Sequence, residues 1–222
     1  MSRERNLVIF GTGQMGKLAH HYFTRDSDYE VVGFTVDGRY LERTEFLGLK
    51  VTPWEEAPQV FPAGEITLFV ALSYASMNSI RQGKFDDARS RGYVLASYVS
   101  SRCSYLSDEP VGANCFILED NTIQPFVSIG DNVTLWSGNH VGHDAVIQDH
   151  CFVTSHVVIS GNVVLGHHSF LGVNSTIRDS VSVAPRTLIG AGAIITSDTE
   201  EGGVYVPARS VKLGKTSDEM GL

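Results

Sequence analysis

Hydrophobic and polar residues follow two different patterns along this chain, and the change between them falls near residue 98. In the first part, short aliphatic runs alternate with segments of helical character, in the order NLVIF, KLAHHYFTR, YEVVGFTVD, EITLFVALS and MNSIRQGKFDDARSRG. This order predicts an α/β unit with a short parallel sheet. Fewer than about 100 residues can hold only one half of a doubly wound dinucleotide fold, so we expect a Rossmann-like half.

From Val111 onwards the pattern repeats every six residues. All fifteen hexads between Val111 and Glu200 begin with Val, Ile or Leu, and their fifth positions are small or medium-sized. Neither an α-helix nor an ordinary strand has this period, whereas a parallel β-helix does. Three hexads make one coil, so residues 18 apart should stack at about 4.8 Å. The sequence therefore predicts an α/β domain at 1–98 and a β-helix domain with a short C-terminal tail at 99–222.

The charge of the 222-residue chain narrows the classes of partner. Its formal net charge is −8 and it has no run of Lys and Arg, which argues against nucleic acid or an anionic membrane as a partner. No segment reaches the roughly 18–20 consecutive apolar residues of a membrane span, so we expect a cytoplasmic protein. Cys103, Cys115 and Cys151 are odd in number and lack CxxC spacing, which predicts free, buried thiols.

A glycine-rich segment, GTGQMG, joins the first predicted strand to its helix. Such a turn offers backbone N–H groups and a helix N-terminus to a phosphate. Asp37 ends the next strand, where a carboxylate can accept a hydrogen bond from a ribose hydroxyl or a base. Tight strand-to-helix turns also favour glycine, which is the alternative explanation. We expect Gly11, Thr12, Gly13 and Gln14 to bind a mononucleotide-sized ligand together with Asp37.

The hexads, of the form [LIV]-G-x-x-[small]-x, resemble those of the left-handed β-helix hexapeptide-repeat acyltransferases. With the strand-GTGQMG-helix unit included, the whole chain resembles the sugar-nucleotide N-acetyltransferases that modify amino-deoxy sugars for bacterial surface glycans such as lipopolysaccharide O-antigen. The sialic acid O-acetyltransferases are similar over the same span. The resemblance implies a left-handed parallel β-helix, a homotrimer, acetyl-CoA as co-substrate in the cleft between neighbouring β-helices, and a sugar nucleotide in the N-terminal domain.

The resemblance also implies roles for individual residues. The hexad VGHDAV matches the family's catalytic segment, so His143 is the implied general base and Asp144 its acidic neighbour. One coil later, the backbone N–H of Gly161 is the implied donor to the thioester carbonyl. Contacts to the pantetheine arm of acetyl-CoA fall on Val173 and Ala191, which are again 18 residues apart.

Three segments depart from the family's pattern. Gln14 and Met15 stand where the glycine-rich turn often has glycine and histidine, and Phe152 stands where some members have a second histidine near the cofactor. His156 is a weaker alternative for that polar role. The closing segment VYVPARS lacks the family's internal glycine.

Three functions fit the sequence. The first is N-acetylation, by acetyl-CoA, of a 4-amino-4,6-dideoxyhexose linked to a nucleoside diphosphate. The second is O-acetylation of a related sugar, and the third is a non-catalytic trimeric binding module. A zinc site at His140 and His143, as in β-helix enzymes of the carbonic anhydrase type, leaves the N-terminal unit unexplained, so we expect no metal. The nucleotide stays open between GDP, UDP and dTDP, and Ser73 and Tyr74, at the end of the strand LFVALS, are expected to contribute to that choice.

Overall fold

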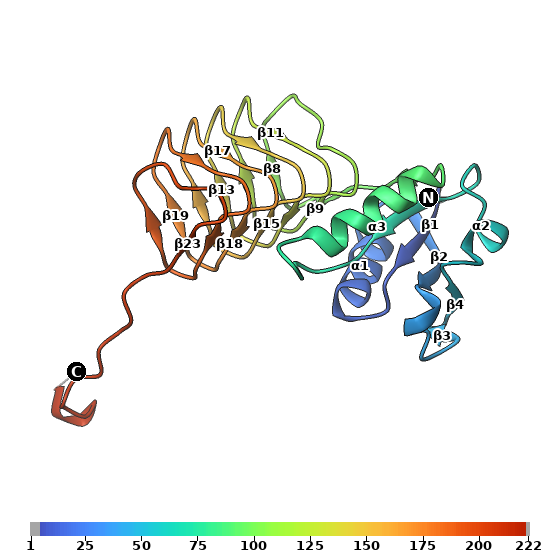
Figure 1. Ribbon diagram of the computed structural model, residues 1–222, viewed down its shortest axis with the longest axis horizontal. Helices are drawn as coiled ribbons and strands as arrows, with labels where there is room; N and C mark the ends of the chain where they lie inside the picture. The colour runs from blue at the N-terminus through green and yellow to red at the C-terminus, as the bar shows by residue number, and fades with distance from the viewer. Residues whose placement is uncertain (1–4, 221–222) are drawn as a thin grey trace.

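The computed structural model describes residues 5–220 and shows two connected units, a sheet with helices and a β-helix (Figure 1). The sheet has six strands in the order β3-β4-β2-β1-β5-β6, and every neighbouring pair is parallel except β3 and β4. Its elements are β1 (Arg5–Phe10), α1 (Gln14–Arg25), β2 (Tyr29–Val36), the short 3-10 helix η1 (Gly38–Tyr40), β3 (Glu45–Phe46), β4 (Leu49–Pro53), α2 (Ala57–Val60), β5 (Thr67–Val70), α3 (Ser79–Ser90) and β6 (Val94–Leu95).

Strand β1 is buried on both faces of this sheet, which explains its uninterrupted aliphatic sequence. Leu7 and Ile9 pack with the buried residues of α1 on one face, and Val8 and Phe10 pack with those of α2 and α3 on the other. Its neighbours are β2 on one side and β5 on the other. The loops that follow these three strands therefore meet at one edge of the sheet, where the direction of the strand order changes.

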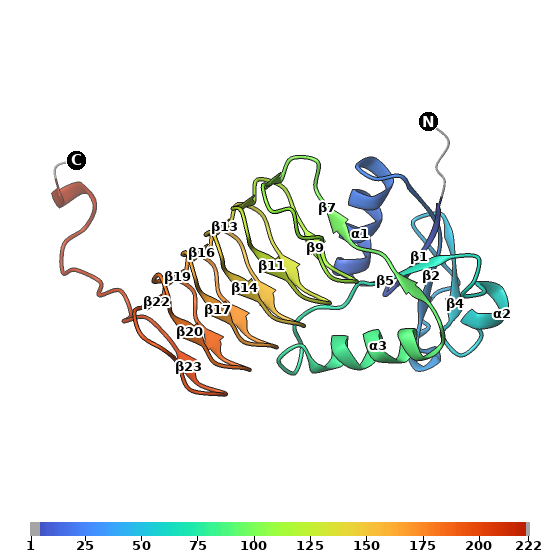
Figure 2. The same cartoon turned by 90° about the horizontal axis from the view of Figure 1, so that it is seen from above.

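The second unit is a parallel β-helix with three faces, each a stack of two-residue strands (Figure 2). The seven-strand face holds β7 (Tyr98–Val99), β9 (Phe116–Ile117), β12 (Thr134–Leu135), β15 (Phe152–Val153), β18 (Phe170–Leu171), β21 (Leu188–Ile189) and β23 (Val204–Tyr205). The six-strand face holds β8 (Ser104–Tyr105), β10 (Thr122–Ile123), β13 (His140–Val141), β16 (Val158–Ile159), β19 (Thr176–Ile177) and β22 (Ile194–Ile195). The four-strand face holds β11 (Ser128–Ile129), β14 (Val146–Ile147), β17 (Val164–Leu165) and β20 (Ser182–Val183).

The predicted six-residue period is confirmed by the register of these strands. Each strand pairs with the strand one coil later, as Val141 pairs with Ile159 and Ile159 with Ile177. The first residues of the hexads point inward and form the aliphatic core together with the fifth residues, and Val141 and Ile147 are both buried. This repeat fits the left-handed parallel β-helix that the hexads indicate.

The three corners of the β-helix are named here by a residue or element at each. The His143 corner, between the six-strand and four-strand faces, includes residues 124–127, 142–145, 160–163 and 178–181. The α3 corner, between the four-strand and seven-strand faces, includes residues 148–151 and 166–169. The Val173 corner, between the seven-strand and six-strand faces, includes residues 154–157, 172–175 and 190–193.

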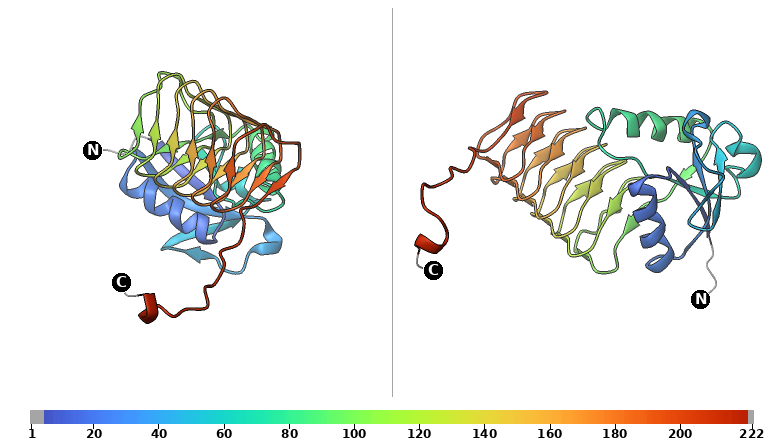
Figure 3. Two further views of the ribbon diagram at one scale, coloured as in Figure 1. Left: turned by 90° about the vertical axis from the view of Figure 1, so that its left-hand side faces the viewer. Right: turned by 90° about the horizontal axis from the view of Figure 1, so that it is seen from below.

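Two helices join the sheet to the β-helix, one at each corner that borders the seven-strand face. Figures 2 and 3 show α3 reaching from the sheet to the edge of the β-helix. Before its first turn, Asn78 donates a hydrogen bond from Nδ2 to the His168 carbonyl oxygen. From α1, Tyr22 donates to Glu119 at 2.8 Å, and Asp26, next to the end of the helix, accepts from Tyr98 at 2.6 Å. The sheet therefore lies beside the N-terminal coils of the β-helix, next to β7 and β9 (Figure 2).

The chain leaves the β-helix after β23 and ends in a tail with a short 3-10 helix, η2 (Asp218–Met220), far from the other elements (Figure 1). Within the described residues, no helix is long and apolar enough to cross a membrane. The prediction of free, buried thiols holds for Cys115 and Cys151, whereas Cys103 is partly exposed. Burial raises the pKa of Cys115 and of Cys151 to about 12, so both thiols stay protonated.

Candidate functional site

A cavity of about 970 Å³ lies between the sheet and the β-helix. One wall is formed by the loops that follow β1, β2 and β5, and the other by the seven-strand face and the Val173 corner. All seven residues that the sequence predicted for substrate binding line it: Gly11, Thr12, Gly13, Gln14, Asp37, Ser73 and Tyr74. The β-helix contributes Trp136, Phe152, Thr154, Ser155 and Val173. The two units thus share one binding space.

The glycine-rich loop brings backbone close to backbone at the mouth of this cavity. Gly11 has a φ of 117°, a conformation that favours glycine, and a Cβ atom there would lie 2.8 Å from the Ala71 carbonyl oxygen. A Cβ atom at Gly16 would collide with the Gly11 carbonyl oxygen. Within the described chain, Gly13 caps α1 without a side-chain hydrogen bond and the first turn has no acidic residue. The first N–H groups of α1 are therefore available to an anion.

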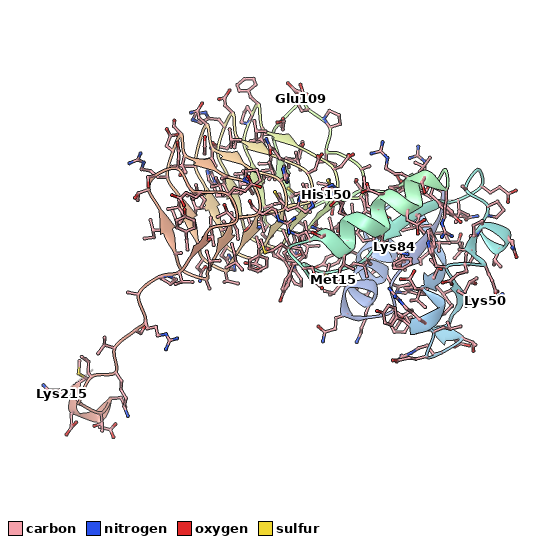
Figure 4. The ribbon with its side chains drawn as sticks, in the orientation of Figure 1. Met15, Lys50, Lys84, Glu109, His150 and Lys215 are labelled. Carbon is pink, nitrogen blue, oxygen red and sulfur yellow. The ribbon has the colours of Figure 1, made fainter. Side chains whose placement is uncertain are left out.

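Asp37 lies at the end of β2, as predicted, and it is paired with a residue that the sequence did not indicate. Nζ of Lys84 on α3 lies 2.5 Å from Oδ1 of Asp37, and both side chains are largely buried. The Lys84 ammonium also lies 4.6 Å from the ring centroid of Phe10 and 5.2 Å from that of Trp54. Figure 4 labels Lys84 on α3 and Met15, which lines the cavity, at the start of α1. This ion pair holds the Asp37 carboxylate in place.

Tyr74 follows β5 and packs against the β-helix. Its ring centroid lies 5.1 Å from that of Phe152 and 4.8 Å from that of Phe170. Ser76, Met77 and Asn78, between Tyr74 and α3, all have positive φ, which is costly for residues with a side chain. The contacts of Asn78 with the α3 corner hold this loop in its conformation.

A buried guanidinium lies beneath this loop. Arg81 is only 1% exposed, and it donates hydrogen bonds to Thr134 Oγ1, to Asn78 Oδ1 and to the carbonyl oxygens of His150 and Cys151. Burial lowers its pKa to about 10, so it remains charged. The sequence did not indicate this role, because a charged side chain on a helix ordinarily faces solvent.

The predicted catalytic residues meet at the His143 corner. Nδ1 of His143 lies 2.8 Å from Oδ2 of Asp144, and both side chains are about half exposed. The backbone N–H of His143 donates to Oε1 of Gln124 at 2.8 Å. A Cβ atom at Gly161 would lie 2.8 Å from Nε2 of His143, so the imidazole extends over this glycine. Between residues 5 and 220, no group accepts a hydrogen bond from the Gly161 N–H.

Val173 and Ala191 stack at a different corner. The N–H of Gly192 donates to the Val173 carbonyl oxygen, and a Cβ atom at Gly172 would lie 2.5 Å from the Ala191 nitrogen. Val173 lines the cavity, whereas in the described chain His143, Asp144 and Gly161 do not. Within one chain, the predicted nucleotide-binding residues and the predicted catalytic residues therefore occupy different places.

The alternative of a zinc site concerns His140 and His143. His140 lies on the six-strand face and His143 at the corner that follows it. In the part of the chain that the structure describes, no three His, Cys, Asp or Glu residues are grouped so that they could hold a metal ion.

The geometry defines a β-helix protein with a cavity beside its N-terminal sheet, and comparisons with known proteins show which of them share this fold. The family model described as bacterial transferase hexapeptide (six repeats) matches residues 127–161. No curated protein matches the sequence. The acetyltransferase domain of PglB from Neisseria gonorrhoeae is 20% identical, with a TM-score of 0.82 over 92% of this chain and 97% of that one.

Two further solved structures have the same fold. PerB from Caulobacter crescentus, in complex with CoA and GDP-perosamine, is 21% identical with a TM-score of 0.71, over 92% of this chain and 95% of that one. WeeI from Acinetobacter baumannii is 19% identical with a TM-score of 0.77, over 91% of this chain and 97% of that one. The predicted resemblance to the hexapeptide-repeat sugar-nucleotide acetyltransferases is thus confirmed for the fold of the β-helix.

Proposed function

We propose that this protein is an acetyl-CoA-dependent N-acetyltransferase that acts on the 4-amino group of a nucleotide-linked amino-dideoxy sugar. The observation that carries this proposal is the cavity, because its nucleotide-type loops face a hexapeptide β-helix across one binding space. Small-molecule sites in parallel sheets lie at the carboxyl ends of the strands, as this cavity does. The structure of PerB, which has this fold, contains CoA and GDP-perosamine, and this supports the same pair of ligands here.

The sheet unit, residues 1–98, is the proposed sugar-nucleotide domain. The free N–H groups at the start of α1 suit the diphosphate, since a helix N-terminus carries a partial positive charge. Asp37, held in place by its contact with Lys84, suits a hydrogen bond from the ribose or the base. Ser73 and Tyr74, in the loop after β5, complete the wall on the side of the sugar.

The β-helix wall of the cavity suits a deoxy sugar. Trp136, Phe152 and Val173 present apolar surface, which matches the hydrocarbon face and the 6-methyl group of a 6-deoxyhexose better than it matches a 6-hydroxyl. Thr154 and Ser155 add hydroxyl groups beside this surface. A site of this kind fixes the orientation of a sugar by a few polar contacts on an apolar floor.

The β-helix, within residues 99–222, is the proposed acetyl-transfer domain. With its Nδ1 beside Asp144, His143 can use Nε2 as the general base that takes a proton from the attacking amine, and Asp144 stabilises the resulting imidazolium. The Gly161 N–H is the proposed donor to the oxyanion of the reacting carbonyl. Val173 and Ala191 would hold the pantetheine arm of acetyl-CoA through backbone groups. Acetyl-CoA supplies the activated acetyl group, and no metal takes part in this scheme.

A complete site then requires a second copy of the chain. His143 and Gly161 lie at one corner, while the described walls of the cavity include the Val173 corner and not the His143 corner. In a homotrimer, the His143 corner of one subunit would face the cavity and the Val173 corner of its neighbour. We include the homotrimer, a cytoplasmic location and a role in bacterial surface glycan synthesis, such as that of lipopolysaccharide O-antigen, in the proposal.

The proposal is tested by measuring release of the CoA thiol from acetyl-CoA with GDP-, UDP- and dTDP-linked 4-amino-4,6-dideoxyhexoses. His143→Ala should lower kcat by roughly 10²-fold or more, as expected for loss of a general base, while the affinity for acetyl-CoA persists. His167→Ala is the matched control, because His167 occupies the same hexad position at the α3 corner and its N–H also donates to a glutamine side chain, that of Gln148. His167→Ala should leave turnover within about twofold.

Three outcomes would contradict the proposal. Unchanged turnover in His143→Ala would remove His143 from the mechanism. Turnover only with hydroxyl sugars would make the protein an O-acetyltransferase. Binding of nucleotide sugars without any turnover would favour a non-catalytic binding module.

A further inference from the structure

Asp179 belongs to the same column of turns as His143 and Gly161. These turns follow β13, β16 and β19, which Figure 2 shows stacked on one face. A Cβ atom built on Gly161 would lie 2.8 Å from Nε2 of His143 and 3.0 Å from Oδ1 of Asp179. An imidazole nitrogen and a carboxylate oxygen therefore flank the same point, and the glycine between them has no side chain to separate them.

The contacts of Asp179 leave one of its oxygens for a ligand. Oδ2 accepts a hydrogen bond from the Ser180 hydroxyl at 2.7 Å, whereas Oδ1 is the oxygen next to Gly161. Asp179 and His143 are both exposed, so a ligand can approach from outside the column. Hydrogen bonds from nitrogen span about 2.7–3.2 Å. Nε2 of His143 and Oδ1 of Asp179 therefore both border the space outward from Gly161, where an attacking nitrogen would approach.

The His143 imidazole and the Asp179 carboxylate together can distinguish an amine nucleophile from a hydroxyl nucleophile. An amine that attacks a carbonyl becomes positively charged on nitrogen until it loses a proton, and it carries at least two N–H bonds at that moment. A hydroxyl has one O–H bond, which the base must take, and its oxygen stays neutral or negative. A carboxylate beside the nucleophile stabilises the positively charged nitrogen of an attacking amine, and it repels the developing negative charge on an attacking hydroxyl oxygen.

We propose that Asp179 is a specificity-determining residue, which makes the site at His143 and Gly161 select an amine over a hydroxyl. This inference rests on the proposed acetyltransferase function and deepens it. The nitrogen lone pair forms the N–C bond, one N–H proton passes to Nε2 of His143, and the C–S bond breaks with its electron pair on sulfur. The sulfur then takes up that proton from His143 to give the CoA thiol. Asp179 accepts a hydrogen bond from the remaining N–H and exchanges no proton in the reaction.

The test compares Asp179→Asn with the full-length wild-type protein. The probes are the GDP-, UDP- and dTDP-linked 4-amino-4,6-dideoxyhexoses as substrates and the matching 4-hydroxy sugar nucleotides as competitive inhibitors. We expect kcat/KM for the amine to fall by roughly 10- to 100-fold, the worth of one charge-assisted hydrogen bond. The inhibition constant of the 4-hydroxy competitor should fall or stay constant. A purely structural role would not change the ratio of amine to hydroxyl recognition in this way.

Two further variants keep the test decisive. Asp149→Asn is the matched control, because Asp149 has the same hexad position and its side chain accepts a backbone N–H at the α3 corner, where asparagine can also accept it. Asp179→Glu keeps the charge and should retain part of the preference for the amine. If the wild type acetylates amines and Asp179→Asn keeps kcat/KM within twofold, the inference is wrong while the proposed function stands. If the wild type releases no CoA thiol with any amine, the proposed function itself fails.

Discussion

Acid should destabilise this protein through one buried histidine at the α3 corner. His168 is 6% exposed, its Nε2 lies 2.8 Å from Oε1 of Gln82, and its ring lies 4.8 Å from that of His150. Burial is the main cause that lowers the pKa of His168 from 6.5 to about 4, and the neighbouring His150 and His167 lower it further. The folded protein therefore does not take up this proton until the pH approaches 4, whereas the unfolded chain takes it up near 6.5.

The sign and size of the effect follow from proton linkage. Between pH 6.5 and about 4 the unfolded state binds more protons at His168, so the free energy of unfolding falls as the pH falls through this window. Well above pH 6.5, His168 is neutral in both states, so it no longer makes the free energy of unfolding depend on pH. The difference between the two pKa values corresponds to roughly 3 kcal/mol. The pKa of His150 is also lowered, mainly by burial, so His150 likewise lowers the free energy of unfolding as the pH falls.

His168→Asn should remove most of this pH dependence. Asn114 and Asn132 occupy the same column with the same left-handed backbone, so asparagine fits the conformation. The assay is urea unfolding at pH 7.5 and at pH 4.5, at one fixed protein concentration, followed by tryptophan fluorescence. The wild type should lose about 2–3 kcal/mol more than the variant between these two pH values. Equal losses in the two proteins would refute the argument that burial keeps His168 neutral.

The contacts of α3 lead to two more predictions. Arg81→Met leaves buried oxygens without their donor, so we expect the free energy of unfolding to fall by roughly 3 kcal/mol, and the urea midpoint measures this. A midpoint equal to that of the wild type would mean that the guanidinium contributes nothing. Asp37→Ala should raise KM for the sugar nucleotide, and Lys84→Met, which leaves Asp37 unpaired, should raise it roughly fivefold, both with KM for acetyl-CoA unchanged. An effect confined to acetyl-CoA would show that the nucleotide is wrongly placed.

The β-helix was predictable because its sequence rule is local. Each hexad needs an inward aliphatic residue and a small residue near the turn, whatever the distant parts of the chain do, so Val141 and Ile147 could be assigned to the core from the sequence. The stacking of His143 on Gly161 follows from the same rule, since one coil is 18 residues long. The loops at the edge of the sheet were predictable for a similar reason, because parallel strands bring their carboxyl ends together.

The position of the sheet on the β-helix was not predictable, since it depends on contacts between distant residues. Asn78 contacts His168, and Arg81 contacts Thr134, across 90 and 53 residues of sequence. In the helical segment MNSIRQGKFDDARSRG, Arg81 and Lys84 look like two solvent-exposed charges, and only packing shows that one is buried and the other is paired with Asp37. Without these contacts, the sequence predicts the walls of the cavity but not that they face each other.

The corners also show which polar residues the backbone requires and which it does not. The fourth residue of the hexads has a positive φ from Asn114 through Gly192, a conformation that favours Gly, Asn, Asp and His. Asp144, with a φ of 57°, is therefore explained by the turn alone, and its contact with His143 is an added property. The third residue has no such restriction, and His143 and Asp179 both occupy it. Because nothing in the backbone demands an ionisable side chain there, a functional explanation carries more weight for these two residues than for the histidines in the fourth position.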